Sequence, residues 1–294
     1  MNAKKTLALL GAVAVLSLSS CYTIGREIDK NEADAIQAAI LKENEERKPT
    51  SYTIKFSVEG KRVEGERNEE LIEESTVSFD MNKCVARLVE TKTTTLKTTE
   101  EATSTYLSYD YCLFYKEGYL YFTYDRGMRV NEEEYPPSKE YAKKTFEETK
   151  AKSLFAEAFK APDSLDYGMR FLNSVAPIAS YYRSGECDVT YYSRDEGNLT
   201  SQTKVHSDDY KEEGTSGQLD FFSNITIDDF VVTSIEWGLE CSKTTSGVTT
   251  TYDYSGAANA IRYANTAVPD IKDFQECEAD PALAVLNFKS ALEL

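Results

Sequence analysis

The sequence has little of what catalytic and metal sites are usually built from. It contains one histidine, His206, so zinc sites that depend on a pair of histidines are excluded. Its six cysteines show no C-x-x-C spacing, which argues against zinc knuckles and thioredoxin-type redox motifs. Glycine-rich phosphate loops and the G-x-S-x-G nucleophile motif are also missing. We therefore expect no catalytic residue, no metal site and no cofactor, and we expect that the protein is not an enzyme.

Basic residues are also fewer than acidic residues. The chain has 33 Lys and Arg against 50 Asp and Glu, a formal net charge of −17. A field of that sign repels the phosphates of nucleic acids, so nucleic-acid binding is not expected. The carboxylates alone do not indicate a glycosidase, because acidic runs such as residues 132–134 are typical of solvated surface. The lone His206 lies in a polar stretch and is interpreted as a surface side chain.

Long apolar runs are absent apart from one near the start. Residues 7–18 carry no charge and follow a short basic segment that contains Lys4 and Lys5. As a helix this run spans about 18 Å, against about 30 Å for the hydrocarbon core of a bilayer. The length is typical of a signal peptide and short for a permanent transmembrane span.

The apolar run ends in Leu18-Ser19-Ser20-Cys21, which resembles the lipobox of bacterial lipoproteins. The resemblance implies cleavage between Ser20 and Cys21 and a diacylglyceryl group on the Cys21 thiol. The alternative is an ordinary signal peptide in which Cys21 is incidental. Lipidation would tether the mature chain durably, because two or more acyl chains anchor a protein stably in a bilayer, whereas a single chain binds only marginally. We expect an extracytoplasmic protein on the outer face of the cell membrane, or on the outer membrane if one exists.

Removal of the signal peptide (residues 1–20) deletes Lys4 and Lys5 and no acid, so the net charge moves from −17 to −19 over the remaining 274 residues. We expect a tether at residues 21–28, a single domain at residues 29–274, and a C-terminal segment at residues 275–294. Within that last segment, residues 281–294 read as a short amphipathic helix.

The first half of the domain alternates as β-strands do. Residues 29–48 have helical spacing, with Asp29 or Asn31 as the cap. Residues 51–125 then read as successive antiparallel strands with period-two patterning. Residues 113–122 predict an aromatic hairpin with a Lys-Glu-Gly loop. The Thr-rich residues 91–105 are either two edge strands joined near residues 97–102 or a flexible excursion.

The second half mixes helices and strands. Pro136-Pro137-Ser138 is predicted to end the sheet and to cap a helix over residues 139–160, and Pro162 to open a second helix. Strands resume near Cys187, and residues 231–241 and 248–254 read as further strands. In the first of these, Trp237 lies on the apolar side, as part of the core or of a cavity wall.

The cysteines beyond Cys21 leave two interpretations open. Pairing within each strand-rich block would give disulfides Cys84–Cys112 and Cys187–Cys241, with Cys277 unpaired. Alternatively all five are buried thiols that behave as small apolar side chains.

The chain resembles the LolA-like group of extracytoplasmic carriers, which includes LppX-type lipoproteins. Four features carry the resemblance: the helix at 29–48, the meander from Ser51, the hairpin at 115–121, and the ending Val268-Pro269-Asp270-Ile271-Lys272-Asp273-Phe274. The resemblance implies an α+β fold in which a curved antiparallel half-barrel wraps around a few helices and an apolar cavity. The Thr-rich stretch, the extra C-terminal helix and the further cysteines depart from that pattern.

Three functions follow as hypotheses. The first is a membrane-tethered carrier of a lipid-like or other apolar ligand, whose binding residues the sequence does not single out. The second is a surface interaction protein with a solid core. The third, least supported, is an enzyme that acts on envelope polymers. The tyrosines of residues 106–124 either pack the core or offer flat faces to a ligand such as a sugar.

Overall fold

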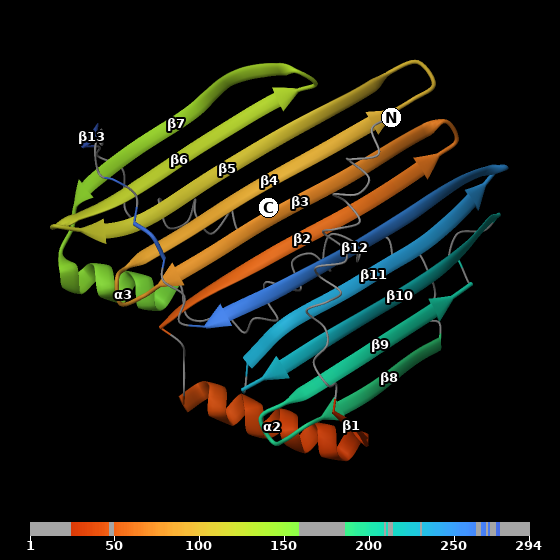
Figure 1. Cartoon of the computed structure of the whole chain (residues 1–294), viewed down its shortest axis with the longest axis horizontal. Coiled ribbons are helices and arrows are strands. Elements are labelled where there is room, and N and C mark those ends of the chain that lie inside the picture. Colours follow the sequence, from red (N-terminus) through yellow and green to blue (C-terminus); the bar gives the residue numbers. More distant parts are fainter. Residues whose placement is uncertain are drawn as a thin grey trace.

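One large antiparallel sheet dominates the molecule (Figure 1). The structure is a computed structural model, and it describes residues 25–46, 50–158, 186–208, 210, 214–229, 231–262, 266–268, 270 and 275–276. The strands, in chain order, are β1 (Arg26–Ile28), β2 (Ser51–Glu64), β3 (Arg67–Asp80), β4 (Val85–Lys97), β5 (Ala102–Lys116), β6 (Tyr119–Val130), β7 (Glu133–Thr145), β8 (Glu186–Ser193), β9 (Leu199–Ser207), β10 (Thr215–Asp228), β11 (Val231–Thr245), β12 (Val248–Arg262) and β13 (Gln275–Glu276). The helices are α2 (Lys30–Glu46) and α3 (Glu148–Ala158).

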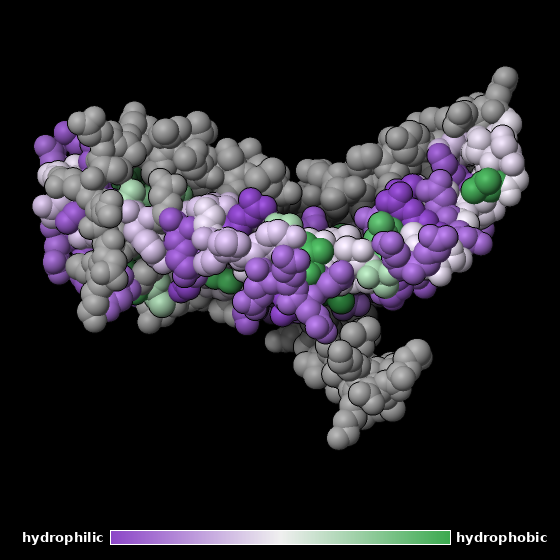
Figure 2. Space-filling model, turned by 90° about the horizontal axis from the view of Figure 1, so that it is seen from above, coloured by the Kyte–Doolittle hydropathy of each residue, from purple (hydrophilic) through white to green (hydrophobic). Residues whose placement is uncertain are grey.

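The sheet consists of two meanders joined at its centre. Its strand order is β1-β8-β9-β10-β11-β12-β2-β3-β4-β5-β6-β7-β13. Strands β2 to β7 follow one another through hairpins, as do β8 to β12, and β12 pairs with β2 over residues 250–262. The short strands β1 and β13 form the two margins, so the sheet is open. Seen along the sheet in Figure 2, the molecule is a curved slab with hydrophilic residues over much of the visible surface.

The helix α2 begins where the sequence predicts. The backbone N–H of Glu32 donates to Oδ1 of Asp29 at 2.9 Å, so Asp29 is the N-cap. Ala33 and Ile40 are buried on the same side of the helix, against Ile28 and Leu199 of the sheet. The helix therefore covers the β8–β9 end of the sheet, in agreement with the prediction of a helix before the first long strand.

Each strand has two unlike sides. We call face A the side that carries Ile54, Phe79, Leu113 and Trp237, and face B the side that carries Phe114 and His206. Face A holds the large core, whose buried members run across eight adjacent strands from β10 to β6. Face B holds a smaller cluster of Val85, Cys112, Phe114 and Tyr121 near the β5–β6 hairpin. The period-two alternation predicted this division.

Three glycines lie directly beneath aromatic side chains of neighbouring strands. A Cβ atom on Gly256 would meet the ring of Trp237 at 2.7 Å, and one on Gly60 would meet the ring of Tyr254 at 2.1 Å. The third pair is Gly238 with Phe222, on face B. Because each glycine is the direct cross-strand partner of its aromatic residue, the ring lies flat over the missing side chain.

The predicted hairpin at residues 113–122 is confirmed. Strands β5 and β6 pair from Lys116↔Tyr119 onward, with Glu117 and Gly118 as the two-residue loop. Both loop residues have positive φ, 53° and 84°, as a type I′ turn requires. In the Thr-rich stretch the strand interpretation is correct, with a turn after Lys97 and β5 beginning at Ala102. These strands are interior ones, since each is paired on both sides.

The prediction of a helix starting at residue 139 is wrong. Pro136 and Pro137 lie within β7, opposite Gly127, where the pairing with β6 shifts register. A bulge tolerates prolines because no ladder hydrogen bond is required there. Residues 139–145 then continue the strand, with a 2.6 Å ion pair between Lys139 and Asp125. The helix α3 starts only at Glu148, and its Phe155 is fully buried in the large core.

Several other expectations are changed by the structure. The fold contains more strand and less helix than the predicted α+β half-barrel, because the sheet makes up most of the described residues. Residues 26–28, placed in the tether by the sequence, form β1 and pair with residues 191–193 of β8. Residues 275–276, placed in the C-terminal segment, form β13 beside β7.

Neither proposed disulfide is formed. Cys84, Cys112, Cys187 and Cys241 form no disulfide with one another, and all are buried except Cys187. Cys84 belongs to the core of face A, whereas Cys112 belongs to the cluster of face B. Two strands separate Cys187 from Cys241, a spacing of about 14 Å. Disulfide bonding requires Cα atoms within about 7 Å. The buried-thiol interpretation therefore holds for Cys84, Cys112 and Cys241 but not for Cys187.

Other predictions lie outside the described residues. These are the signal peptide at 1–20, the cleavage and lipidation positions Ser20 and Cys21, the helix opened by Pro162, the helix at 281–294, and Cys277. Among the residues that are described, neither helix combines the length and apolar character needed to cross a bilayer.

Candidate functional site

Face B carries a line of ionisable side chains across five strands. The cross-strand register places Glu186 of β8 opposite His206 of β9, and His206 opposite Asp220 of β10. The line continues through Glu240 of β11 and Asp253 of β12. We call these five residues the His206 row. Directly opposed strand residues lie about 5 Å apart, so four carboxylates and one imidazole share one strip of surface.

His206 is held by two carboxylates. Its Nδ1 atom lies 2.7 Å from Oδ1 of Asp220, and its Nε2 atom lies 3.2 Å from Oδ2 of Asp208. Both carboxylates are acceptors, so both ring nitrogens must carry protons for the two hydrogen bonds to form. The hydrogen bonds that His206 donates to Asp220 and then to Asp208 accordingly raise its pKa above 6.5. The side chain keeps 43% of its surface exposed, so water screens these interactions.

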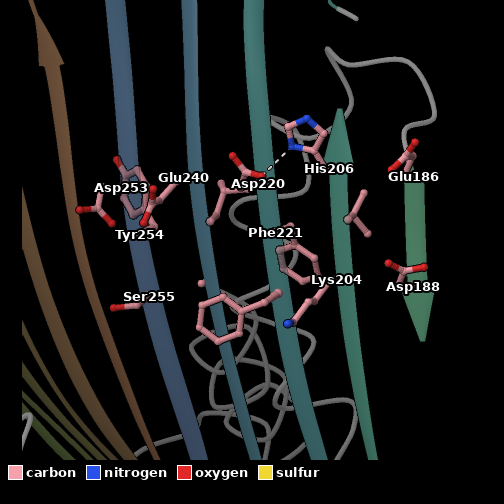
Figure 3. A pocket seen from close by; sticks show the side chains of 14 residues that line it. Glu186, Asp188, Lys204, His206, Asp220, Phe221, Glu240, Asp253, Tyr254 and Ser255 are labelled. Atoms are coloured by element: carbon pink, nitrogen blue, oxygen red, sulfur yellow. Dashed lines mark hydrogen bonds and ion pairs between the residues drawn. The ribbon is translucent and has the colours of Figure 1, made fainter. Parts of the chain in front are cut away.

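A pocket of about 520 Å³ lies over the His206 row (Figure 3). Its lining adds Asp188, Lys204 and Phe222 to the row. Phe222 is 46% exposed and lies over Gly238, which brings an aromatic face into a largely charged site. The pocket can therefore accept a ligand group that is positively charged and in part apolar.

The contacts of His206 bear on whether it can act as a general base. Both ring nitrogens of His206 are engaged by carboxylates, so the ring is not poised to act as a general base. No three His, Cys, Asp or Glu side chains of the described residues are arranged to hold a metal ion. Ser201 and Lys204 have S-x-x-K spacing, but residues three apart on one strand point to opposite faces.

The tyrosines of residues 106–124 are divided between the two faces. Tyr111 and Tyr115 pack against the core of face A, while Tyr119 and Tyr121 belong to the cluster of face B. Tyr106 lies under the guanidinium of Arg129, 5.2 Å from ring centroid to Cζ. This distribution favours the packing interpretation, because the rings do not form one flat platform. Trp237, 2% exposed, lies in the core of face A, as its strand position predicted.

The sequence missed the partners of His206. Asp208 is visible as its neighbour two residues on, but the pairing with Asp220 depends on the register of β9 and β10 and on no local motif. Ser20 and Cys21, the sites singled out from the sequence, lie outside the described residues.

Comparisons with known proteins do not assign a family. No model of a protein family matches the chain, and no curated protein matches it in sequence. Among solved structures, a β-barrel-like protein of unknown function from Brucella abortus matches with 8% identity and a TM-score of 0.27, over 74% of this chain and 99% of that one.

Two autotransporter domains are also similar at this level. The translocator domain of NalP from Neisseria meningitidis has 7% identity and a TM-score of 0.16, over 76% of this chain and 92% of its own. The β domain of a Bordetella autotransporter has 6% identity and a TM-score of 0.21, over 71% and 99%. These scores are too low to support an argument about function.

Proposed function

We propose that the protein is a lipid-anchored, extracytoplasmic binding protein without enzymatic activity, and that it holds a lipid-like or other apolar ligand against face A. The observation that carries the proposal is the extent of the apolar core on face A. Buried apolar side chains of face A run across eight adjacent strands of an open sheet, a width of roughly 34 Å at about 4.8 Å per strand.

Of the two described helices, only α3 contributes to that core, through Ala151 and Phe155. α2 packs on β8 and β9, beside the core. Figure 1 shows both helices at the same ends of the strands, at the lower left of the view. A large apolar face on a curved open sheet is suited to an acyl chain, because dispersion and burial favour binding without directed polar contacts.

The anchor is part of the same proposal. The order of basic start, apolar run and Leu18-Ser19-Ser20-Cys21 supports export and lipidation. Attachment would keep the binding face beside the bilayer from which a lipid-like ligand comes.

The single tryptophan supplies a direct test. Trp237 is buried in the core of face A, between Ile235 and Leu239 along β11. A brominated fatty acid quenches tryptophan only on contact, so 9,10-dibromostearate should quench Trp237 emission in the Cys21→Ser protein, and stearate should not. Absence of quenching at saturating fatty acid would contradict the proposal.

A matched variant locates the ligand. In the double variant Trp237→Phe, Phe222→Trp the single tryptophan moves to face B, where residue 222 is 46% exposed. The proposal expects little quenching by dibromostearate in this variant. Equal quenching on both faces would indicate unspecific adsorption and would overturn the assignment to face A.

A second candidate function is a surface interaction protein with a solid core. The specific observation in its favour is tight burial: Val77, Phe79, Leu113 and Leu239 are fully buried. This candidate would be favoured if dibromostearate did not quench Trp237 and if an organic extract of the purified protein contained no bound lipid.

A further inference from the structure

Within the described residues, the outer edge of β8 is paired over only part of its length. β8 pairs with β9 over residues 186–192, whereas β1 covers its other side only at residues 191–193. β1 stops at Ile28 because Asp29 caps α2 and the chain turns into the helix. In the strand order of the sheet, residues 186–190 of β8 are therefore at the margin, over about 17 Å of strand.

This edge is accessible and negatively charged. Glu186, Cys187, Asp188 and Val189 are all exposed, and Val189 keeps 43% of its surface in solvent. Glu186 and Asp188 face the pocket on face B, where Asp220, Glu240 and Asp253 follow across the sheet. Among the described residues that line the pocket, Lys204 and His206 are the only basic side chains beside these five acids.

We propose that residues 186–190 of β8 bind an extended basic peptide segment of a protein partner, which adds to the sheet as one more strand. Edge strands present backbone N–H and C=O groups that template such pairing. This inference does not depend on the apolar ligand of face A, and it concerns a different surface.

The alternation of β8 fixes the side-chain pattern of the partner. Glu186 and Asp188 project to face B, and Cys187 and Val189 to face A. A matching partner has Lys or Arg at alternate positions, which lie on face B beside the carboxylates of Glu186 and Asp188. The apolar residues between them lie on face A, beside Cys187 and Val189. The net charge of −17 steers such a segment toward the chain.

Strand addition is distinguishable from charge attraction alone. The probe is a fluorescein-labelled peptide Lys-Val-Lys-Val-Lys, with binding followed by fluorescence anisotropy on the full chain in detergent. Two N-methylated forms, one methylated at the Lys amides and one at the Val amides, remove donors from opposite edges of the peptide strand. One form should lose about tenfold or more in affinity, and the other should bind as the parent does. Equal binding of the two forms would overturn the proposal.

Charge variants test the location. Glu186→Gln, Asp188→Asn should weaken binding of the basic peptide several-fold, while Glu100→Gln, Glu101→Gln removes the same charge from an exposed turn and should leave binding unchanged. A Glu-Val-Glu-Val-Glu peptide should not bind. Equal weakening by the two double variants would overturn the proposal. So would a dimer, seen by sedimentation, that dissociates on Glu186→Gln, Asp188→Asn, because a second copy would then occupy the edge.

Discussion

The Nδ1 atom of His206 lies 2.7 Å from Oδ1 of Asp220, its direct partner across β9 and β10. With Asp208 on the other ring nitrogen, this contact favours the doubly protonated ring and raises the pKa of His206. The lone histidine is thus a charged element of an acidic surface, and it can be observed without interference from another histidine.

Asp220→Asn should lower the pKa of His206 toward its ordinary value, because the largest contribution to the raised pKa comes from Asp220. The Hε1 resonance of the ring, followed by NMR between pH 5 and pH 9, measures it. The matched control is Asp253→Asn, in the same row but three strands away from His206, which should shift the pKa much less. Identical titration of wild type and Asp220→Asn would contradict the assignment.

The same contact makes stability depend on pH. A group whose pKa is raised on folding binds more protons in the folded state than in the unfolded state. The contribution of His206 to the free energy of unfolding is therefore complete below pH 6.5, and it is lost as the pH rises through the pKa of His206 in the folded protein. The difference in free energy of unfolding between wild type and His206→Gln, from urea titrations, should shrink across that window. A difference that grows with pH would contradict the geometry.

Gly256→Ala should destabilise the fold by about 1–3 kcal/mol, because the new methyl group would meet the ring of Trp237 at 2.7 Å. Urea unfolding followed by circular dichroism measures the cost. In a Trp237→Leu background the ring is gone, and the cost of Gly256→Ala should fall by half or more. An equal cost in both backgrounds would point to strand backbone effects instead of the ring.

The cysteines should differ in reactivity according to their burial. Burial raises the pKa of the Cys112 thiol to about 12 and raises that of Cys84 as well, whereas Cys187 is exposed. Iodoacetamide at pH 8 should modify Cys187 in the native protein and reach Cys84, Cys112 and Cys241 only on unfolding. Peptide mapping by mass spectrometry measures the extent of modification at each cysteine. A Cys84–Cys112 disulfide, or equal labelling of Cys112 and Cys187, would contradict the structure.

Cys21→Ala should abolish both lipid attachment and signal cleavage, since the proposed lipid anchor is a diacylglyceryl group on that thiol. Incorporation of labelled palmitate and fractionation of membranes measure the two effects. Cys187→Ala, which changes another cysteine, is the control and should remain labelled. Normal labelling and processing of the Cys21→Ala protein would support an ordinary signal peptide.

Local pattern predicted α2, the strands up to β6 and the apolar face of β11 well. Asp29 caps a helix, and Ile54, Phe79 and Trp237 lie on the apolar face because period-two alternation fixes which side each occupies. The β5–β6 loop was predicted because Gly118 suits positive φ.

What escaped prediction depends on contacts between distant residues. Pro136 and Pro137 appeared to end the sheet, but a bulge opposite Gly127 accommodates them. The pairing of β12 with β2 and of His206 with Asp220 follows from strand order and register, which no short motif encodes. Asp208 was visible beside His206, but the cross-strand partner was not.

Native mass spectrometry of the purified full chain tests the central claim most directly. Binding of an apolar ligand against face A predicts a mass above that of the lipidated polypeptide. The excess should leave on collisional activation and be recovered as an apolar molecule in an organic extract. A single mass equal to the polypeptide with its anchor, unchanged after incubation with fatty acids or phospholipids, would contradict the account.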